Sequence, residues 1–284
     1  MAKYEIKNGV GIIPKGTTKI VGAAFENCKD LKSVVIPNSV TKIGARAFAL
    51  CSGLTHIDIP RSVTEIEGSA FDDCASLTSI TIPKSVTKIG WQAFTGCLGL
   101  TSIIVSKGNK KYDSRENCNA IIETETNTLI QGCNTSFIPD SITRIGEYAF
   151  KNCEKLTSIV IPNSVESIGL GAFEYCESLA NIVIPSSVKK IEACAFENCK
   201  NLKSVVVLAG LNKIYYRAFA NCFSLETITL PIGVNSIRDD VFYDCTALKT
   251  IYVPAKKTDY YKRRLDEKLH SLIVELPAEK KAKK

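Results

Sequence analysis

A phenylalanine followed three positions later by a cysteine recurs along the whole chain at a nearly constant spacing. The nine pairs are Phe25/Cys28, Phe48/Cys51, Phe71/Cys74, Phe94/Cys97, Phe150/Cys153, Phe173/Cys176, Phe196/Cys199, Phe219/Cys222 and Phe242/Cys245. Successive cysteines are 23 residues apart, except that Cys97 and Cys153 are separated by an additional insertion of 33 residues. A fixed period of this length is typical of stacked-repeat proteins, in which each repeat forms one coil. We therefore expect a single elongated domain.

The repeats share the template L-x-x-I-x-I-P-x-S-V-x-x-I-G-x-x-A-F-x-x-C-x-x, seen most clearly at residues 77–99. Its I-x-I segment alternates with period two, which predicts a strand, and the following proline ends that strand because it has no N–H to donate. The V-x-x-I segment predicts a second short extended piece. Adjacent Ala and Phe with Cys three positions later predict one helical turn that faces inward. One coil buries too few apolar side chains to fold alone, so many copies must stack.

The glycine of the template marks a crowded position that does not require a left-handed backbone. In four repeats the residue is glycine, namely Gly44, Gly90, Gly146 and Gly169. In others it is Glu67, Glu192, Tyr215 or Arg238. Since only glycine adopts positive φ cheaply, this variety predicts a close approach of backbones rather than an unusual φ.

This template resembles the BspA-like type of leucine-rich repeat, and the resemblance covers nearly the whole chain. It includes the insertion from Tyr112 to Cys133 and the closing segment from Val253 to Lys262. The resemblance implies an α/β solenoid, a right-handed superhelix with parallel strands on one face and short strands or helical turns on the other. It also implies no catalytic activity and a role as a bacterial surface adhesin or protein-interaction module.

The ends and the insertion interrupt the repeat and set the expected boundaries. We expect an N-terminal cap at residues 1–20, repeats over 21–253, a hairpin insertion at about 106–138, and a C-terminal helix, strand and basic tail over 254–284. In the cap, Tyr261, Leu265 and Leu269 predict a helix from Thr258 to His270.

The insertion is a second candidate recognition element. It contains two β-like runs, Ala120–Glu123 and Thr128–Ile130, which predict a hairpin that projects from the fourth coil. Cys118 and Cys133 lie within it, and they either pair across the hairpin or pack against the solenoid.

The cysteines do not predict a metal or catalytic site. No C-x-x-C motif occurs, and the only histidines are His56 and His270, so zinc spacing and a nucleophile–base pair are both absent. The nine repeat cysteines are expected to be reduced, inert core residues. Cys194 lies where other repeats carry mostly polar residues, so it is either the most reactive thiol or a tolerated substitution. We expect no cofactor, no metal and no enzymatic activity.

The charge distribution argues against nucleic acid as a partner. The formal net charge is +7, but residues 249–284 hold eleven Lys/Arg and five Asp/Glu and so carry +6, which leaves the repeats nearly neutral. No apolar run is long enough to span a membrane. Residues 1–8 lack the apolar core of a secretory signal, which together with the many thiols predicts a cytoplasmic location. Removal of a leader would instead leave a cell-surface or secreted protein.

The outward side chains of the predicted strands form two columns across the sheet. The first column is polar: Ser33, His56, Ser79, Ser102, Ser158, Asn181, Ser204, Thr227 and Thr250. The second is more apolar: Val35, Asp58, Thr81, Ile104, Val160, Val183, Val206, Thr229 and Tyr252. From these columns we select the following as candidate partner-binding residues: Ile104, Ser158, Val160, Asn181, Val183, Ser204, Val206 and Tyr252.

Val160, Val183 and Val206 would form an apolar stripe that receives a protein partner, or they simply reflect the preference of valine for strands. We expect a non-enzymatic protein-interaction or adhesion module, with host or extracellular-matrix proteins as candidate partners. The alternative function is a structural element that associates end to end through its solenoid.

Overall fold

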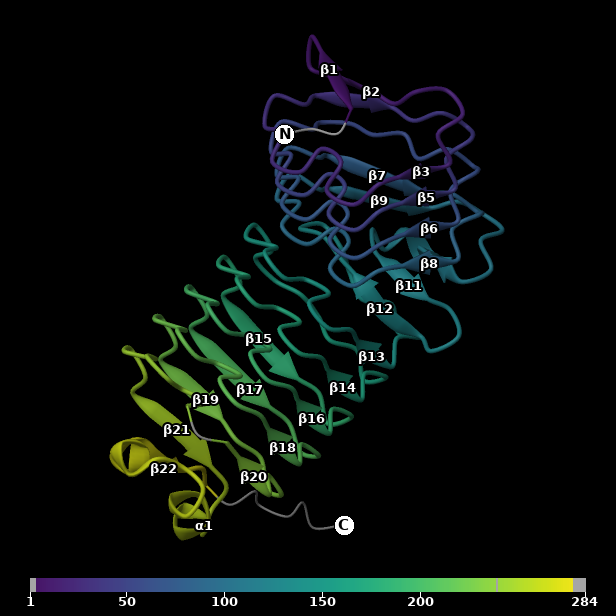
Figure 1. The fold of residues 1–284 in the computed structure, drawn as a ribbon. Helices are drawn as coiled ribbons and strands as arrows, with labels where there is room; N and C mark the ends of the chain where they lie inside the picture. Colours follow the sequence, from purple (N-terminus) through teal and green to yellow (C-terminus); the bar gives the residue numbers. More distant parts are fainter. Residues whose placement is uncertain (1–3, 239, 278–284) are drawn as a thin grey trace. The chain divides into compact units, whose positions relative to one another are not determined.

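The computed structural model describes residues 4–238 and 240–277. The chain is a solenoid of coils with short parallel strands, as predicted, and contains very little helix (Figure 1). It forms two compact units, where the uniform repeat predicted one array. The first unit runs to Pro139 and includes Tyr148–Lys155; the second comprises Asp140–Glu147 and the described residues from Leu156 onward. The expected basic tail from residue 278 lies outside the described residues.

The first unit begins with a hairpin of β1 (Glu5–Lys7) and β2 (Val10–Ile12), and β2 pairs in parallel with β4 (Ser33–Val35). Two further parallel ladders follow. One is β3 (Lys19–Ile20), β5 (Lys42–Ile43), β6 (Glu65–Ile66) and β8 (Lys88–Ile89); the other is β7 (Ser79–Ile82) with β9 (Ser102–Val105). Residues 23 positions apart are partners throughout, so the sequence period sets the register.

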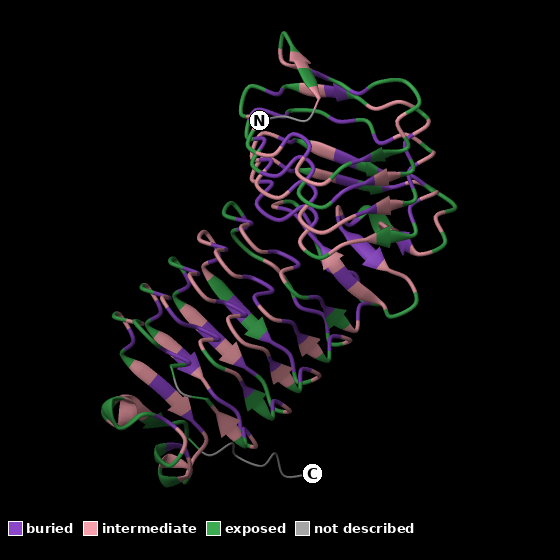
Figure 2. Ribbon diagram, in the orientation of Figure 1, coloured by how far each residue is buried: buried purple, intermediate pink, exposed green. Residues whose placement is uncertain are grey.

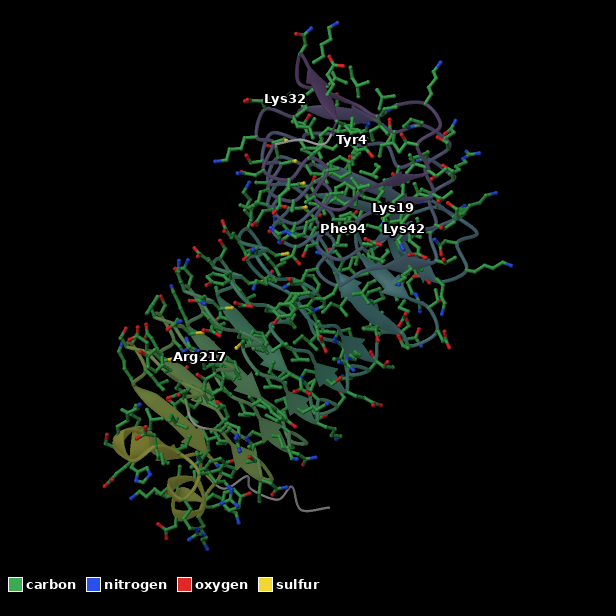
Figure 3. The ribbon with its side chains drawn as sticks, in the orientation of Figure 1. Tyr4, Lys19, Lys32, Lys42, Phe94 and Arg217 are labelled. Carbon is green, nitrogen blue, oxygen red and sulfur yellow. The ribbon has the colours of Figure 1, made fainter. Side chains whose placement is uncertain are left out.

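This register places side chains of the same template position side by side. Lys19 and Lys42 are partners on β3 and β5 (Figure 3), and both ammonium groups bind Glu67, at 3.3 and 3.0 Å. A glutamate therefore relieves the repulsion between the stacked lysines. The ring of Tyr4 packs 5.5 Å from that of Phe25, which covers the first coil.

The insertion forms β10 (Tyr112–Asp113), a 3-10 turn η1 (Arg115–Asn117), β11 (Ile121–Glu123) and β12 (Thr128–Gln131). The predicted hairpin is confirmed, since β11 and β12 pair in antiparallel fashion. The prediction that it projects is wrong. Its apolar side chains are buried, and the Tyr112 hydroxyl accepts a hydrogen bond from the Ile89 amide at 3.1 Å.

The end of the insertion takes the place of a template turn. The Gly132 amide donates to the Ala149 carbonyl oxygen at 2.7 Å, as the Phe25 amide does to Ala47. A Cβ at Gly132 would lie 2.2 Å from the Phe150 ring, so this position has no room for a side chain.

The second unit contains two parallel ladders. One is β13 (Arg144–Ile145), β14 (Ser167–Ile168), β16 (Lys190–Ile191), β18 (Lys213–Ile214) and β20 (Ser236–Ile237). The other is β15 (Asn181–Ile184), β17 (Ser204–Val207), β19 (Thr227–Thr229), β21 (Thr250–Val253) and β22 (Ile273–Glu275). Figure 2 shows buried and more exposed residues alternating along these coils.

The C-terminal helix is shorter than predicted. It breaks into α1 (Thr258–Lys262) and a 3-10 segment η2 (Glu267–Leu272), because Asp266 is extended and its side chain accepts a hydrogen bond from the Lys268 amide. Tyr261 on α1 is buried, and its hydroxyl donates to the Pro231 carbonyl oxygen, which fixes the cap to the last repeat.

Two template strands do not form. Residues 54–59 and 156–161 lack the ladder hydrogen bonds, although Ile57 and Ile161 remain buried. In the described part of the chain, one backbone hydrogen bond joins each segment to a neighbouring coil. The Thr55 amide donates to the Lys32 carbonyl oxygen at 3.1 Å, and the Ala180 amide donates to the Thr157 carbonyl oxygen at 3.3 Å. Alternation thus fixes which side chains are buried even where the ladder is incomplete.

The predicted helical turn around each phenylalanine is wrong. The residues two before and two after every repeat Phe have left-handed φ values, of 52° to 59° and 55° to 71° respectively. A right-handed helix cannot continue through such residues. The turn is instead a third ladder, in which the amides of Ala23, Phe25 and Asn27 donate to carbonyls of the next coil at 2.7 to 2.9 Å.

The phenylalanines form the centre of each core. In the first unit the rings of Phe25, Phe48, Phe71 and Phe94 stack at 5.2 to 5.4 Å, nearly parallel. In the second unit the rings of Phe173, Phe196, Phe219 and Phe242 stack at 5.1 to 6.0 Å. The crowding expected at the template glycine is also present, since a Cβ at Gly90 would lie 2.3 Å from the Gly68 amide nitrogen.

Candidate functional site

The predicted apolar column of the second unit lies on an open strand face. Val183, Val206, Thr229 and Tyr252 are register partners along β15, β17, β19 and β21. Val183 is 52% exposed, and Val206 and Tyr252 are partly exposed. Val160, one repeat earlier and outside a strand, is 81% exposed. The side chains thus present apolar surface on successive coils.

A polar column runs beside these valines. Asn181 and Ser204 are register partners, and the Ser204 hydroxyl donates to Asn181 Oδ1 at 2.7 Å. Ser158 occupies the same template position and is exposed. This hydrogen bond restricts the rotamers of the two stacked side chains, so this part of the polar column is ordered beside the valines.

Charged residues flank the polar column on its other side. Lys203, Glu226 and Lys249 occupy one template position on three successive repeats, and all are exposed. Lys249 and Glu226 form an ion pair at 3.1 Å. The strand face therefore carries an apolar stripe, a polar column and a column of alternating charge.

Two exposed apolar residues near this face were not selected from the sequence. Leu208 is 44% exposed and follows Val206 by two positions, which in extended chain gives the same side. Ile232 is 56% exposed and follows Pro231. Leu208 replaces the template proline, so its departure from the repeat was a usable signal.

Ile104, the remaining candidate residue, belongs to the first unit. It is 52% exposed and is the register partner of Thr81 on β7 and β9. Val35 of the same unit is 69% exposed on β4. The first unit thus has exposed apolar residues of its own.

Seven of the nine repeat cysteines are buried, whereas Cys28 and Cys245, in the first and last repeats, are partly exposed. The Cys51 thiol donates to the Phe25 carbonyl oxygen at 2.9 Å, and Cys74 and Cys97 make the same contact at 3.1 and 3.2 Å. Burial raises the pKa of the Cys51 thiol to about 12. The thiolate, which is the nucleophilic form, is therefore strongly disfavoured.

Cys194 is only partly exposed, and its surroundings do not activate it. Burial and the neighbouring Glu197 raise the pKa of its thiol to about 12. Arg217 would favour a thiolate, but its guanidinium binds Glu197 at 2.6 and 2.9 Å. In the insertion, Cys118 and Cys133 are free thiols that contact the carbonyl oxygens of Ala120 and Asn119.

The described residues contain no cluster of three His, Cys, Asp or Glu side chains that could hold a metal ion. His56 is exposed and contacts Asp58 at 3.1 Å, whereas His270 contacts the Leu265 carbonyl oxygen at 3.2 Å. Within the same residues, no helix is both long and apolar enough to cross a membrane.

The repeat geometry and the sequence agree with one family. The model of the BspA type leucine rich repeat region, in six copies, matches residues 7–122 and 127–262. The chain belongs to this family. The matched residues thus run from β2 to α1, with a gap at residues 123–126. The match supports a repeat-based interaction module in general.

Solved structures support the same fold. This BspA-type chain is 34% identical to a leucine rich cell surface protein from Faecalibacterium prausnitzii A2-165, with a TM-score of 0.76 over 87% of this chain and 66% of that protein. It thus spans less than two thirds of that relative. A leucine-rich repeat protein from Eubacterium ventriosum is 24% identical, with a TM-score of 0.73 over 86% and 72% of the two chains. The pneumococcal vaccine antigen PcpA is 20% identical, with a TM-score of 0.71 over 86% and 68%. The comparison with curated proteins gives no match.

Proposed function

We propose that this BspA-type chain is a non-enzymatic module that binds a protein partner through the strand face of its second unit. The observation that carries the proposal is the exposure of Val160 and Val183, at 81% and 52%, on consecutive repeats. Val206 continues the column. Covering a fully exposed valine contributes up to about 1.5 kcal/mol, so a partner that covers the column gains several kcal/mol.

The arrangement of the face also favours a protein partner. The exposed apolar residues lie in one column, and the polar and charged columns lie along one side of it, so that apolar and polar surface adjoin as they do in protein interfaces. The register fixes the side chains at a constant spacing of about 4.8 Å between coils. Because these side chains are already ordered, little conformational entropy would be lost on binding, which favours affinity.

The chemistry of the chain supports a role without catalysis. Most of its thiols are buried, burial raises the pKa of the Cys51 and Cys194 thiols, and the two histidines contact the Asp58 carboxylate and the Leu265 carbonyl oxygen. Buried thiols resist oxidation, so the cysteine content is compatible with an extracellular location. The Faecalibacterium relative is described as a cell surface protein, which supports a surface location for this chain as well.

The alternative, end-to-end association, is less well supported. The described residues from Lys249 onward hold seven Lys/Arg and four Asp/Glu, so this end is basic. Residues 4–20 hold three lysines and one glutamate, so the other end is basic too. Charges of the same sign oppose head-to-tail stacking, whereas the strand face carries both signs.

Capture from host-cell and extracellular-matrix extracts tests the proposal. The intact chain is compared with a Val160→Lys/Val183→Lys/Val206→Lys variant, whose fold is checked by circular dichroism. A Val35→Lys/Ile104→Lys variant of the first unit is the control. We expect the triple variant to lose at least nine tenths of a partner that the intact chain and the control retain. Equal recovery by all three proteins would exclude the strand face.

A further inference from the structure

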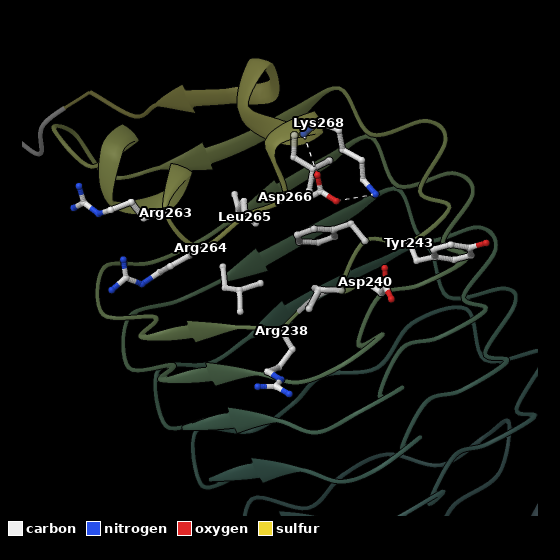
Figure 4. A pocket seen from close by; sticks show the side chains of 12 residues that line it. Arg238, Asp240, Tyr243, Arg263, Arg264, Leu265, Asp266 and Lys268 are labelled. Carbon is white, nitrogen blue, oxygen red and sulfur yellow. Dashed lines mark hydrogen bonds and ion pairs between the residues drawn. The ribbon is translucent and has the colours of Figure 1, made fainter.

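A cavity of about 250 Å³ lies in the second unit, between the turn of the last repeat and the C-terminal cap (Figure 4). Val241, Phe242 and Leu265 supply apolar lining, and each is nearly buried. A dry cavity of about 150 Å³ accepts benzene, so this space is large enough for a small ligand. It belongs to neither of the columns of the strand face.

The turn of the last repeat has backbone donors without acceptors. In the preceding repeats, the amides of the Phe-centred turn donate to carbonyls of the next coil; Phe196 donates to Ala218 at 2.8 Å and Phe219 to Val241 at 3.0 Å. Among the described residues, no further Phe-centred turn follows that of Phe242. Within residues 4–238 and 240–277, the Phe242 and Asp240 amides have no acceptor.

By the repeat geometry, these amides point toward the position of a following coil, which is where residues 263–269 of the cap and the cavity lie. Phe242 is only 6% exposed, and a buried N–H without a partner is unfavourable. Asp240 has a φ of 59°, and neighbouring amides around a left-handed residue form concave sites that attract anions. The Phe242 and Asp240 amides thus belong to residues that line the cavity, and they lack an acceptor within the described part of the chain.

The same amides of Gln92, Phe94 and Gly96 also lack an acceptor among the described residues, where the insertion interrupts the first unit. Free amides alone therefore do not define a ligand site. What distinguishes the Phe242 turn is the cavity together with its cations.

Four cations and two carboxylates line the cavity. Arg238 and Arg263 are exposed and have no acidic partner in the described part of the chain. Lys268 binds Asp266 at 3.1 Å. The guanidinium of Arg264 lies over the Tyr260 ring at 3.6 Å, and Asp240 is exposed. The excess of positive charge favours an anion.

Figure 4 shows how these groups are distributed. Leu265 lies centrally, Arg263 and Arg264 lie on one side, and Asp266 and Lys268 lie on another. The guanidinium groups of Arg238 and Arg263 extend away from the centre in this view. Exposed arginine side chains change rotamer within nanoseconds, so both can turn toward a bound anion.

We propose that this cavity binds an oxyanion of the carboxylate or phosphate class. One oxygen accepts hydrogen bonds from the Phe242 and Asp240 amides, at about 2.9 Å, in the place that a carbonyl of a further coil would take. Arg238 and Arg263 neutralise the charge, as charge-assisted bonds to carboxylate or phosphate require. This site is independent of the partner-binding face, so either can be wrong without the other.

Amide NMR spectra recorded during titration with inorganic phosphate, and separately with sodium acetate, test the proposal. Ionic strength is held constant with sodium chloride. We expect saturable shifts of the Phe242 and Asp240 amides that exceed those of Phe196 and Cys194. Saturation with phosphate alone would assign the phosphate class, and saturation with acetate alone the carboxylate class. Absence of saturable shifts at Phe242 and Asp240 with both anions would overturn the proposal.

A charge variant provides an independent comparison. Arg238→Gln/Arg263→Gln is expected to weaken anion binding at least tenfold. Lys29→Gln/Lys107→Gln removes the same charge from exposed positions of the first unit and should change the dissociation constant less than twofold. Equal weakening in both variants would reduce the effect to general electrostatics and contradict a specific site. If the charge variant does not fold, the amide shifts of Phe242 and Asp240 in the unmodified chain still decide the question.

Discussion

The Cys51 thiol donates a hydrogen bond to the carbonyl oxygen of Phe25, one repeat earlier, at a distance of 2.9 Å. The same oxygen also accepts the Cys28 amide at 3.0 Å, so both of its lone pairs are used. The contact recurs between Cys245 and Phe219 at 3.0 Å. Cysteine fits this position because it is small, apolar and still able to donate.

Replacing a buried repeat cysteine should therefore lower the free energy of unfolding by more than the loss of side-chain volume alone would. Cys74→Ala removes the donor to Phe48, at 3.1 Å, and leaves a small cavity. We expect the free energy of unfolding to fall by about 1 to 2 kcal/mol in urea denaturation. Cys194→Ala, which alters a partly exposed thiol, serves as the control and should change it by less than about 0.5 kcal/mol. Equal effects of the two substitutions would contradict a role for the thiol ladder.

The repeat period predicted register and burial because both follow from stacking identical positions. It did not predict the Phe-centred turn. In a helical turn, residues three positions apart lie on the same side. The observed turn, with left-handed residues two before and two after Phe, also places Phe48 and Cys51 on the same side, so their spacing does not distinguish the two conformations. The left-handed position before each Phe is varied, as at Arg46 and Cys194, but the position after it is mostly Asn, Asp or Gly, as at Asn27 and Gly96, and this signal for a left-handed residue was missed.

The candidate site was only partly visible in the sequence. Alternation gave the outward direction of Val160 and Val183. Leu208 and Ile232 were not selected because they lie beyond the alternating segment. The unpaired amides at Phe242 were not recognised because a missing backbone acceptor depends on where the stack ends, and not on any side chain.

Leu50 is a site of avoidable strain in the first unit. It has a φ of 61°, where a leucine is unfavourable by about 1 to 2 kcal/mol, and it is 39% exposed. Leu50→Asn should raise the free energy of unfolding by about 0.5 to 1 kcal/mol, since asparagine tolerates this conformation. The reciprocal change Asn27→Leu, at a φ of 59°, should lower it by a similar amount. Urea denaturation of both variants checks this, and shifts of the same sign would contradict it.

Asp72 makes the stability of the first unit depend on pH. Burial, together with repulsion from Asp73, raises the pKa of its carboxyl from the usual 3.8 to about 6. Between these values the folded protein binds the proton more readily than the unfolded chain. The stabilising contribution of this group is therefore complete below about pH 4 and is lost as the pH rises through 6.

Asp72→Asn should accordingly stabilise the protein at pH 7, by about 1 kcal/mol after allowance for solvent screening. The gain should shrink as the pH falls from 6 to 4. Unfolding midpoints measured at pH 4, 5, 6 and 7 for both proteins provide the test, with Asp30→Asn at an exposed position as the control. A gain that is constant with pH would exclude titration of Asp72 as its cause.

Photochemical cross-linking tests the central claim, that the strand face of the second unit contacts a partner, most directly. A photoreactive phenylalanine analogue replaces Val183 in one protein and Val35 in another; the two sites are 52% and 69% exposed. After irradiation in the extracts described above, we predict that one partner is cross-linked from position 183 with at least tenfold higher yield than from position 35. Cross-linking of that partner with equal or higher yield from position 35 would contradict the account.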